Sequence, residues 1–215
     1  MIARYVYRAQ IRENALDAAQ NLLDRTAMPE DIVTISVFRF EKNLFFYYEL
    51  SGGDRHPEDL FPGLNAFLEA CPFEEEKRYY IRMYDIFHYN RPTADKPWRG
   101  RPMGEPVGRL IRLRPEKVGS YIFYHQQLQE EYPGDGCKYG LIAIHENLLF
   151  FYLETPEYSE EATWKGFLDT KNSPRSQWHE LMHEHFQFWN DERFPYWRND
   201  LTLIYSKRCE SIGTI

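Results

Sequence analysis

The sequence contains few cysteines, no long apolar run and no concentration of positive charge. Its three cysteines, Cys71, Cys137 and Cys209, lie far apart and form no CxxC pair, so we expect reduced thiols. No apolar stretch is long enough to span a membrane and no signal peptide opens the chain, so we expect a cytoplasmic protein without a membrane partner. A net charge of −7 without a Lys/Arg stripe argues against nucleic acid as a partner.

Aromatic residues, in contrast, make up 17% of the chain, and many of them lie in a pattern that occurs twice. Residues Ile35–Leu50 read ISVFRFEKNLFFYYEL, and residues Leu141–Thr155 read LIAIHENLLFFYLET. In each copy, two alternating β-branched and aromatic runs flank a short polar turn that ends in Asn. This pattern predicts two antiparallel strands with one buried face.

Similar elements surround each hairpin. A strand-like run and a helix-like run precede it, and a second helix-like run and an aromatic strand follow it. The flanking runs are Ala3–Gln10, Asn14–Asp24 and Tyr79–Tyr89 for the first copy, and Gly108–Arg114, Lys117–Glu131 and Leu201–Ser206 for the second.

The order β-α-β-β-α-β, present twice, predicts the α+β class with tandem ferredoxin-like repeats. We assign residues 1–90 to the N-terminal repeat and residues 107–215 to the C-terminal repeat. Residues 91–106, with four prolines and two glycines, are predicted to be a linker. Helices cover one face of each sheet, so we expect the other faces to pack together as an intrachain pseudo-dimeric α+β barrel. The chain would then be a monomeric pseudo-dimer or a weak homo-oligomer.

The helix-like run of the second half carries a histidine on its apolar face. Tyr121, Tyr124, His125 and Leu128 fall at i, i+3, i+4 and i+7, which is the face that would meet the sheet. One interpretation is a core imidazole whose hydrogen bonding is satisfied by Tyr121. The other is an acid/base group, because an imidazole titrates close to neutral pH.

Four short motifs of the second half occur in a fixed order between about Gly108 and Ser206. They are Arg114-Pro115-Glu116 with Tyr121–His125, Lys138-Tyr139 with Asn147–Phe150, Thr163-Trp164 with Thr170, and Trp178–Met182. Together they resemble the L-rhamnose mutarotases, a family of small, dimeric α+β barrel proteins. The resemblance implies an isomerase of carbohydrate metabolism that exchanges the α and β anomers of L-rhamnose or a related 6-deoxy monosaccharide. It implies no cofactor and no metal.

The resemblance also implies roles for individual residues. His125 would be the catalytic proton donor, and Tyr121, Tyr139, Trp178 and His179 would hold the sugar. His179 departs from the family pattern, because it stands where the family has a second tryptophan.

The first half lacks this set of residues, with Gln20 at the position of His125 and Leu16 at that of Tyr121. The resemblance therefore implies one active site per chain and a structural role for the N-terminal repeat. His88, in the last strand of that repeat, is a candidate for one wall of the pocket, and an ordinary strand histidine is the alternative.

Two other functions stay open at this point. One is a non-catalytic sugar-binding or regulatory protein that kept the pocket. The other is a zinc peptidase, because His179–His183 reads HELMH, an HExxH string. The candidates for a third zinc ligand are Glu184, His185, Glu192 and Glu210. A polar, solvated helix face explains the same string without metal.

Overall fold

The computed structural model of the 215-residue chain describes residues 2–72, 76–88, 97–99, 103–131, 136–161, 166–168 and 177–208. The chain forms two compact units. The first unit comprises Met1–Met83 with Asp200–Ile215, and the second comprises Tyr84–Asn199. Within the described part of the chain, no helix combines the length and the hydropathy that crossing a membrane requires.

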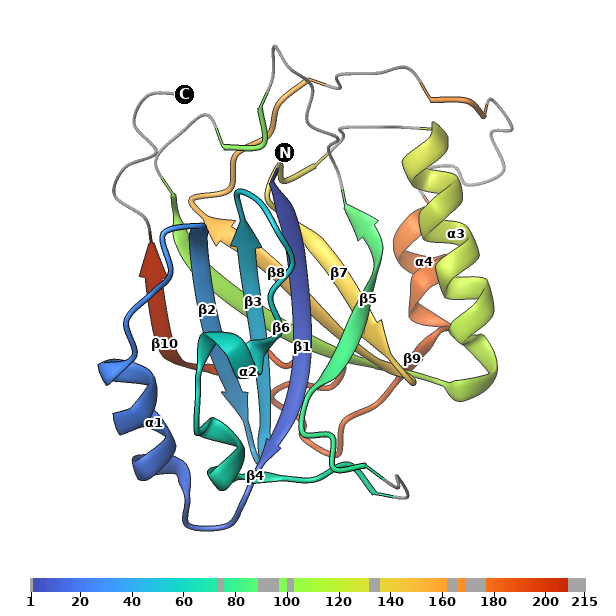
Figure 1. Cartoon of the computed structure of the whole chain (residues 1–215). Helices are drawn as coiled ribbons and strands as arrows, with labels where there is room; N and C mark the ends of the chain where they lie inside the picture. Colours follow the sequence, from blue (N-terminus) through green and yellow to red (C-terminus); the bar gives the residue numbers. More distant parts are fainter. Residues whose placement is uncertain are drawn as a thin grey trace. The chain divides into compact units, whose positions relative to one another are not determined.

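The first unit contains an antiparallel sheet with the strand order β10-β2-β3-β1-β5. The short strand β4 pairs with the C-terminal end of β1. Figure 1 shows α1 and α2 on one face of this sheet. The elements are β1 (Ala3–Ile11), α1 (Leu16–Arg25), β2 (Ile32–Phe40), β3 (Asn43–Leu50), α2 (Pro57–Leu60), a 3₁₀ turn (Leu64–Phe67), β4 (Leu68–Glu69), β5 (Ile81–His88) and β10 (Thr202–Arg208).

The second unit repeats this arrangement with the strand order β5-β7-β8-β6-β9. Helices α3 and α4 lie side by side in Figure 1, and both contribute to one apolar core. The elements are β6 (Glu105–Leu113), a 3₁₀ turn (Pro115–Lys117), α3 (Val118–Glu131), β7 (Leu141–His145), β8 (Leu148–Thr155), α4 (Trp178–His183) and β9 (Phe186–Gln187).

These topologies confirm the predicted fold class of α+β with ferredoxin-like repeats. In each repeat the first strand pairs with the third, and the third pairs with the second. The fourth strands extend the pattern in an unexpected way. Residues Ile81–Met83 of β5 pair with β1 in the first unit, whereas the following part of β5, within residues 84–88, pairs with β7 in the second unit. The fourth strand of the second repeat, β10, pairs with β2 in the first unit.

The compact units therefore do not coincide with the repeats at 1–90 and 107–215. Of the predicted linker, residues 97–99 and 103–106 are described, and β6 already begins at Glu105. The remaining linker residues lie outside the described part. The face-to-face packing of the two sheets and the monomeric state stay predictions.

The two hairpins turn at equivalent glutamates. Glu41 has a φ of 53° and Glu146 a φ of 57°, both in the left-handed region. The flanking pairs are Phe40 with Asn43 and His145 with Leu148. Matching the two turns places Glu41 at the position of Glu146. This alignment of the repeats differs by one position from the alignment that matches Asn43 with Asn147.

The helical runs after the hairpins are shorter than the sequence predicts. Helix α2 begins at Pro57 and has only four residues. The sequence Pro62-Gly63 follows it, and Gly63 has a φ of 87°. Proline lacks the amide hydrogen that a helix interior needs, and this left-handed φ favours glycine, so the chain turns here instead of continuing the helix.

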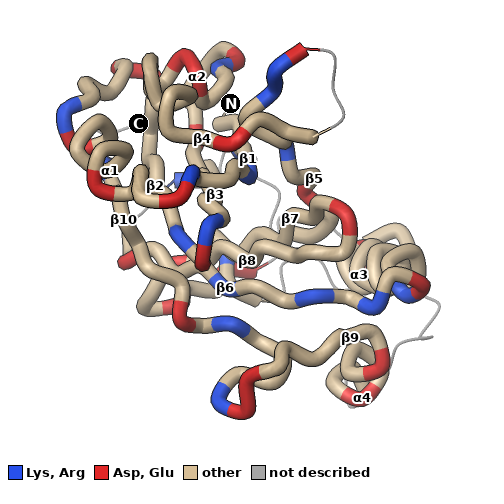
Figure 2. The backbone as a smooth tube through the Cα atoms, turned by 90° about the horizontal axis from the view of Figure 1, so that it is seen from below, with Lys and Arg blue, Asp and Glu red and all other residues tan. Residues whose placement is uncertain are grey.

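Each sheet buries side chains on both faces. In the first unit Phe46 and Tyr48 of β3 pack in the core with Leu23 of α1. Phe45 and Tyr47, which alternate with them along β3, are also fully buried. Charged residues of both signs are interspersed along the described chain (Figure 2).

Two adjacent residues of β10, Leu203 and Ile204, differ in burial. Substituting each of them tests whether β10 packs in the first unit as described. Ile204 is 7% exposed and belongs to the core of this unit, whereas Leu203 is 38% exposed. Replacing Ile204 with Ala should lower the free energy of unfolding by about 2 to 5 kcal/mol. Replacing Leu203 with Ala should lower it by less than ~1 kcal/mol. Urea denaturation with hydrogen exchange of the β2 amides measures both effects, and equal losses would contradict the pairing of β10 with β2.

Candidate functional site

His125 lies in an aromatic cluster of the second unit. Its ring centroid is 4.0 Å from that of Tyr121, 5.0 Å from that of Trp178 and 5.2 Å from that of Phe87. Only 5% of the His125 surface is exposed. We call Phe87, Tyr121, His125 and Trp178 the His125 cluster.

Three elements bring these side chains together. Tyr121 and His125 lie one turn apart on α3, so they share the face that meets the sheet. Trp178 is the first residue of α4, and Phe87 belongs to β5. The cluster is thus assembled from segments that are far apart in the sequence.

A backbone hydrogen bond fixes the tautomer of His125. Its Nδ1 lies 3.0 Å from the carbonyl oxygen of Tyr121. A carbonyl oxygen can only accept, so Nδ1 carries the hydrogen and donates it. In the neutral ring, Nε2 then holds a lone pair, and no described residue donates a hydrogen bond to it.

Burial keeps this imidazole neutral. The pKa of His125 is lowered to about 4, chiefly by desolvation and to a smaller extent by the nearby His185, against the opposing effect of the Tyr121 carbonyl. His125 is therefore an uncharged base at neutral pH, with an unprotonated Nε2 among aromatic rings. Such a group can accept a proton from a bound molecule.

A second buried histidine also contacts the ring of Tyr121. His185 is 1% exposed, and its ring centroid is 5.9 Å from that of Tyr121 and 5.8 Å from that of Tyr124. Its Nδ1 lies 2.8 Å from the carbonyl oxygen of Leu181, and its Nε2 lies 2.9 Å from Oγ of Ser120. Sequence reasoning considered His185 only as a zinc-ligand candidate and missed its contact with Ser120, because 65 positions separate the two residues.

The structure brings together three of the five predicted site residues: His125, Tyr121 and Trp178. His179, on α4, is exposed. Tyr139 belongs to a different cluster, where its ring meets Trp98 edge-on at 5.4 Å between centroids. His88 lies on β5, and its Nδ1 is 3.0 Å from a carboxylate oxygen of Asp85.

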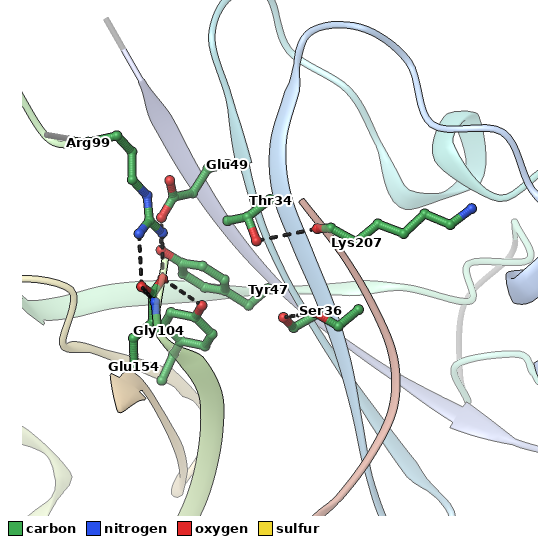
Figure 3. A network of polar contacts seen from close by, with 10 residues as sticks. Thr34, Ser36, Tyr47, Glu49, Arg99, Gly104, Glu154 and Lys207 are labelled. Carbon is green, nitrogen blue, oxygen red and sulfur yellow. Dashed lines mark hydrogen bonds and ion pairs between the residues drawn. The ribbon is translucent and has the colours of Figure 1, made fainter. Parts of the chain in front are cut away.

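The cluster around Tyr139 is built on a buried ion pair (Figure 3). The guanidinium of Arg99 lies 4.2 Å from the Tyr139 ring centroid and donates two hydrogen bonds to Glu154, at 3.0 and 2.6 Å. Glu154 also accepts from the Tyr152 hydroxyl at 3.0 Å and from the Gly104 amide at 3.1 Å. The carboxylate is 2% exposed, and these donors compensate for its lost hydration.

Sequence reasoning missed this carboxylate, although a signal for it exists. Tyr-x-Glu occurs at the same place in both repeats, as Tyr47-Tyr48-Glu49 and Tyr152-Leu153-Glu154. The Tyr47 hydroxyl donates to Glu49 at 2.5 Å, just as Tyr152 donates to Glu154. A glutamate inside an apolar strand pattern indicates a buried charge that needs partners.

The HExxH residues do not assemble a metal site among the described residues. His179, Glu180 and His183 are exposed, and the His183 ring packs against that of Tyr196 at 4.7 Å between centroids. Within the described ranges, no three His, Cys, Asp or Glu side chains come close enough to hold a metal ion. Glu210 lies outside those ranges.

Comparison with known proteins finds similar solved structures but no similar sequence family. No protein-family model and no curated protein matches the chain. A proposed monooxygenase from Fusobacterium nucleatum is 8% identical, with a TM-score of 0.44 over 96% of this chain and 94% of its own. A proposed monooxygenase from Lactobacillus acidophilus is 10% identical, with a TM-score of 0.40 over 96% of both chains. An anthrone oxidase-like protein is 8% identical, with a TM-score of 0.38 over 96% of both chains.

These findings correct the family and the enzyme class inferred from the sequence. The identification with the L-rhamnose mutarotases is wrong, because no family model matches and the similar solved structures are named for oxidation instead. The assignment to the isomerases is wrong for the same reason. Two of the residues that the resemblance assigned to sugar binding, Tyr139 and His179, are not part of the His125 cluster. At TM-scores below 0.5, the likenesses assign no activity to this chain.

The neutral state of His125 predicts a pH dependence of stability. Its pKa is about 4 in the folded state, against about 6.5 when unfolded. Below about pH 6.5 the imidazole takes up a proton in the unfolded state but stays neutral in the folded state. The free energy of unfolding should therefore fall by roughly 3 kcal/mol between about pH 6.5 and about pH 4 because of this residue. Urea unfolding across this range should show a smaller loss for His125→Gln than for the wild type. An identical slope in both proteins would contradict the buried neutral imidazole.

The buried ion pair predicts a large effect of one neutral substitution. Glu154→Gln keeps the shape but leaves the Arg99 charge buried without a carboxylate, so it should cost about 3 to 5 kcal/mol of the free energy of unfolding. The control is Glu69→Gln, which removes an exposed pair with Lys42 at 3.2 Å and should cost less than ~1 kcal/mol. Thermal and urea unfolding compare the two, and similar costs would refute the account of this network.

Proposed function

We propose that the second unit binds a flat, apolar aromatic molecule and that His125 acts as a general base on it. The base would remove a proton from an activated methylene group of the bound molecule. The resulting carbanion would react with molecular oxygen, so the overall activity would be that of an oxygenase.

One observation carries this proposal: the unprotonated Nε2 of His125 among the rings of Tyr121, Trp178 and Phe87. A general base must be neutral at the working pH, and burial supplies that state. Aromatic side chains bind flat apolar molecules through stacked and edge-to-face contacts.

The surroundings of His125 suit such a molecule better than a sugar. A monosaccharide carries many hydroxyl groups, and burying them requires a matching set of hydrogen-bond partners. Besides the imidazole, the side chains of the cluster carry only the Tyr121 hydroxyl and the Trp178 indole N–H as polar groups, and the carbonyl of Tyr121 is occupied by His125 itself. One of the similar structures is named an anthrone oxidase-like protein, but the proposal here rests on the His125 cluster alone.

The proposed reaction balances without a further reductant. Proton transfer from the methylene carbon to Nε2 leaves a carbanion stabilised by the aromatic rings of the substrate. The carbanion supplies electrons to O₂, a C–O bond forms, and a second proton leaves the same carbon as the O–O bond breaks. The methylene becomes a carbonyl, one oxygen atom stays in the product, and the other leaves as water. A positioned base contributes about 10² to 10⁴ in rate to such a proton transfer.

Anthrone is a suitable probe, because it is flat and has an activated methylene. Oxygen uptake and product absorbance should rise above the spontaneous rate with the wild type. His125→Gln should lower kcat by about 10² to 10⁴ while binding persists, since Gln lacks a basic nitrogen. His183→Gln is the matched control, because this histidine is exposed in the same unit and should leave the rate unchanged.

Two results would overturn the proposal. One is an equal rate for the wild type and His125→Gln. The other is quenching of tryptophan fluorescence by anthrone without any acceleration by the wild type, which would show a non-catalytic ligand-binding protein.

A further inference from the structure

We propose that Ser120 and His185 form a nucleophile–base pair that accepts acyl groups from esters. This activity is separate from the one proposed for His125, and it uses a different histidine that also contacts Tyr121. The supporting observations are the hydrogen bonds of His185, the position of Ser120 and the rings around the pair.

The hydrogen bonds of His185 fix the direction of proton transfer. Nδ1 lies 2.8 Å from the Leu181 carbonyl oxygen, which can only accept, so Nδ1 carries the ring hydrogen. Nε2 of the neutral ring therefore presents its lone pair to Oγ of Ser120 at 2.9 Å. This is the arrangement of an activated nucleophile: a hydroxyl, a base within hydrogen-bond reach, and a third group that orients the base.

The hydroxyl of Ser120 has a choice of two acceptors. Its Oγ also lies 3.0 Å from the carbonyl oxygen of Lys117, one turn back along the helix. Without a proton between Oγ and Nε2, two lone pairs would face each other at 2.9 Å, which favours donation to the histidine.

Burial and charge both keep His185 in the basic form. The side chain is 1% exposed, and desolvation lowers the pKa of His185. Lys117 also lowers this pKa, whereas the Leu181 carbonyl and Glu184 raise it. Ser120 lies in the first turn of α3 and is only partly buried, so the proposal requires that an ester approach its hydroxyl from the exposed part of this turn.

The proposed reaction is ester hydrolysis through an acyl-serine. Oγ attacks the ester carbonyl carbon while its proton moves to Nε2, and the bond to the leaving alcohol breaks as Nε2 returns that proton to it. Water then attacks the acyl-serine with Nε2 accepting its proton, and the proton returns to Oγ as the carboxylic acid leaves. The rings of Tyr121 and Tyr124, at 5.9 and 5.8 Å from that of His185, favour an apolar or aromatic acyl group.

Labelling with a fluorophosphonate tests the nucleophile directly. Peptide mass spectrometry should find the phosphonyl adduct on Ser120, and Ser120→Ala should remove it. His185→Gln should slow labelling by about 10² or more, because the base is lost. Ser51→Ala is the control, since Ser51 is an exposed serine whose hydroxyl donates to the Asp31 carbonyl. An unlabelled Ser120, or labelling that His185→Gln leaves unchanged, overturns the proposal.

A cysteine variant keeps the test decisive if His185→Gln does not fold. In Ser120→Cys, transfer of the thiol proton to His185 should give a thiolate that reacts with iodoacetamide well below the ordinary thiol pKa of about 8.5. Cys71, which is partly buried and outside the pair, is the internal reference. A rate for position 120 that is at least about tenfold above that of Cys71 at neutral pH supports the pair. Equal rates and equal pH profiles overturn it.

Discussion

The hydrogen bond from His125 to the Tyr121 carbonyl is the interaction on which the chemistry proposed for the second unit depends. It holds the hydrogen on Nδ1 at 3.0 Å from that oxygen and leaves Nε2 as the basic nitrogen. Burial then prevents the ring from taking up a proton before a ligand arrives. His185 has the same arrangement, because its Nδ1 lies 2.8 Å from the carbonyl oxygen of Leu181. Two buried histidines with the same tautomer therefore contact the ring of Tyr121.

The two repeats share a scaffold and differ in the helix that follows the first strand. Gln20 occupies the place of His125, and its amide donates to the Ile204 carbonyl at 3.3 Å. This contact joins α1 to β10 within the first unit, where the corresponding helix of the second unit carries a base. The same position of the repeat therefore makes a structural contact in the first unit and carries a buried imidazole in the second. The buried Tyr-x-Glu pairs are common to both copies.

The sequence predicted what depends on local periodicity, and it missed what depends on distant partners. Alternation in the hairpins and helical spacing in α3 located the strands, the helix and the contact of Tyr121 with His125. Nothing local indicated that β10 pairs with β2. Nor did any short motif indicate that Ser120 meets His185, because each side chain alone is an ordinary helix or loop residue. The motif resemblance failed because short strings of aromatic residues also arise wherever strands and helices pack on an apolar core.

The most direct test of this account is the protonation state of His125, read by two-bond ¹H–¹⁵N correlation NMR of histidine-labelled protein across an acid titration. We predict hydrogen on Nδ1, a non-protonated Nε2 and a pKa of about 4. A pKa close to the ordinary value of about 6.5, or hydrogen on Nε2, would contradict it.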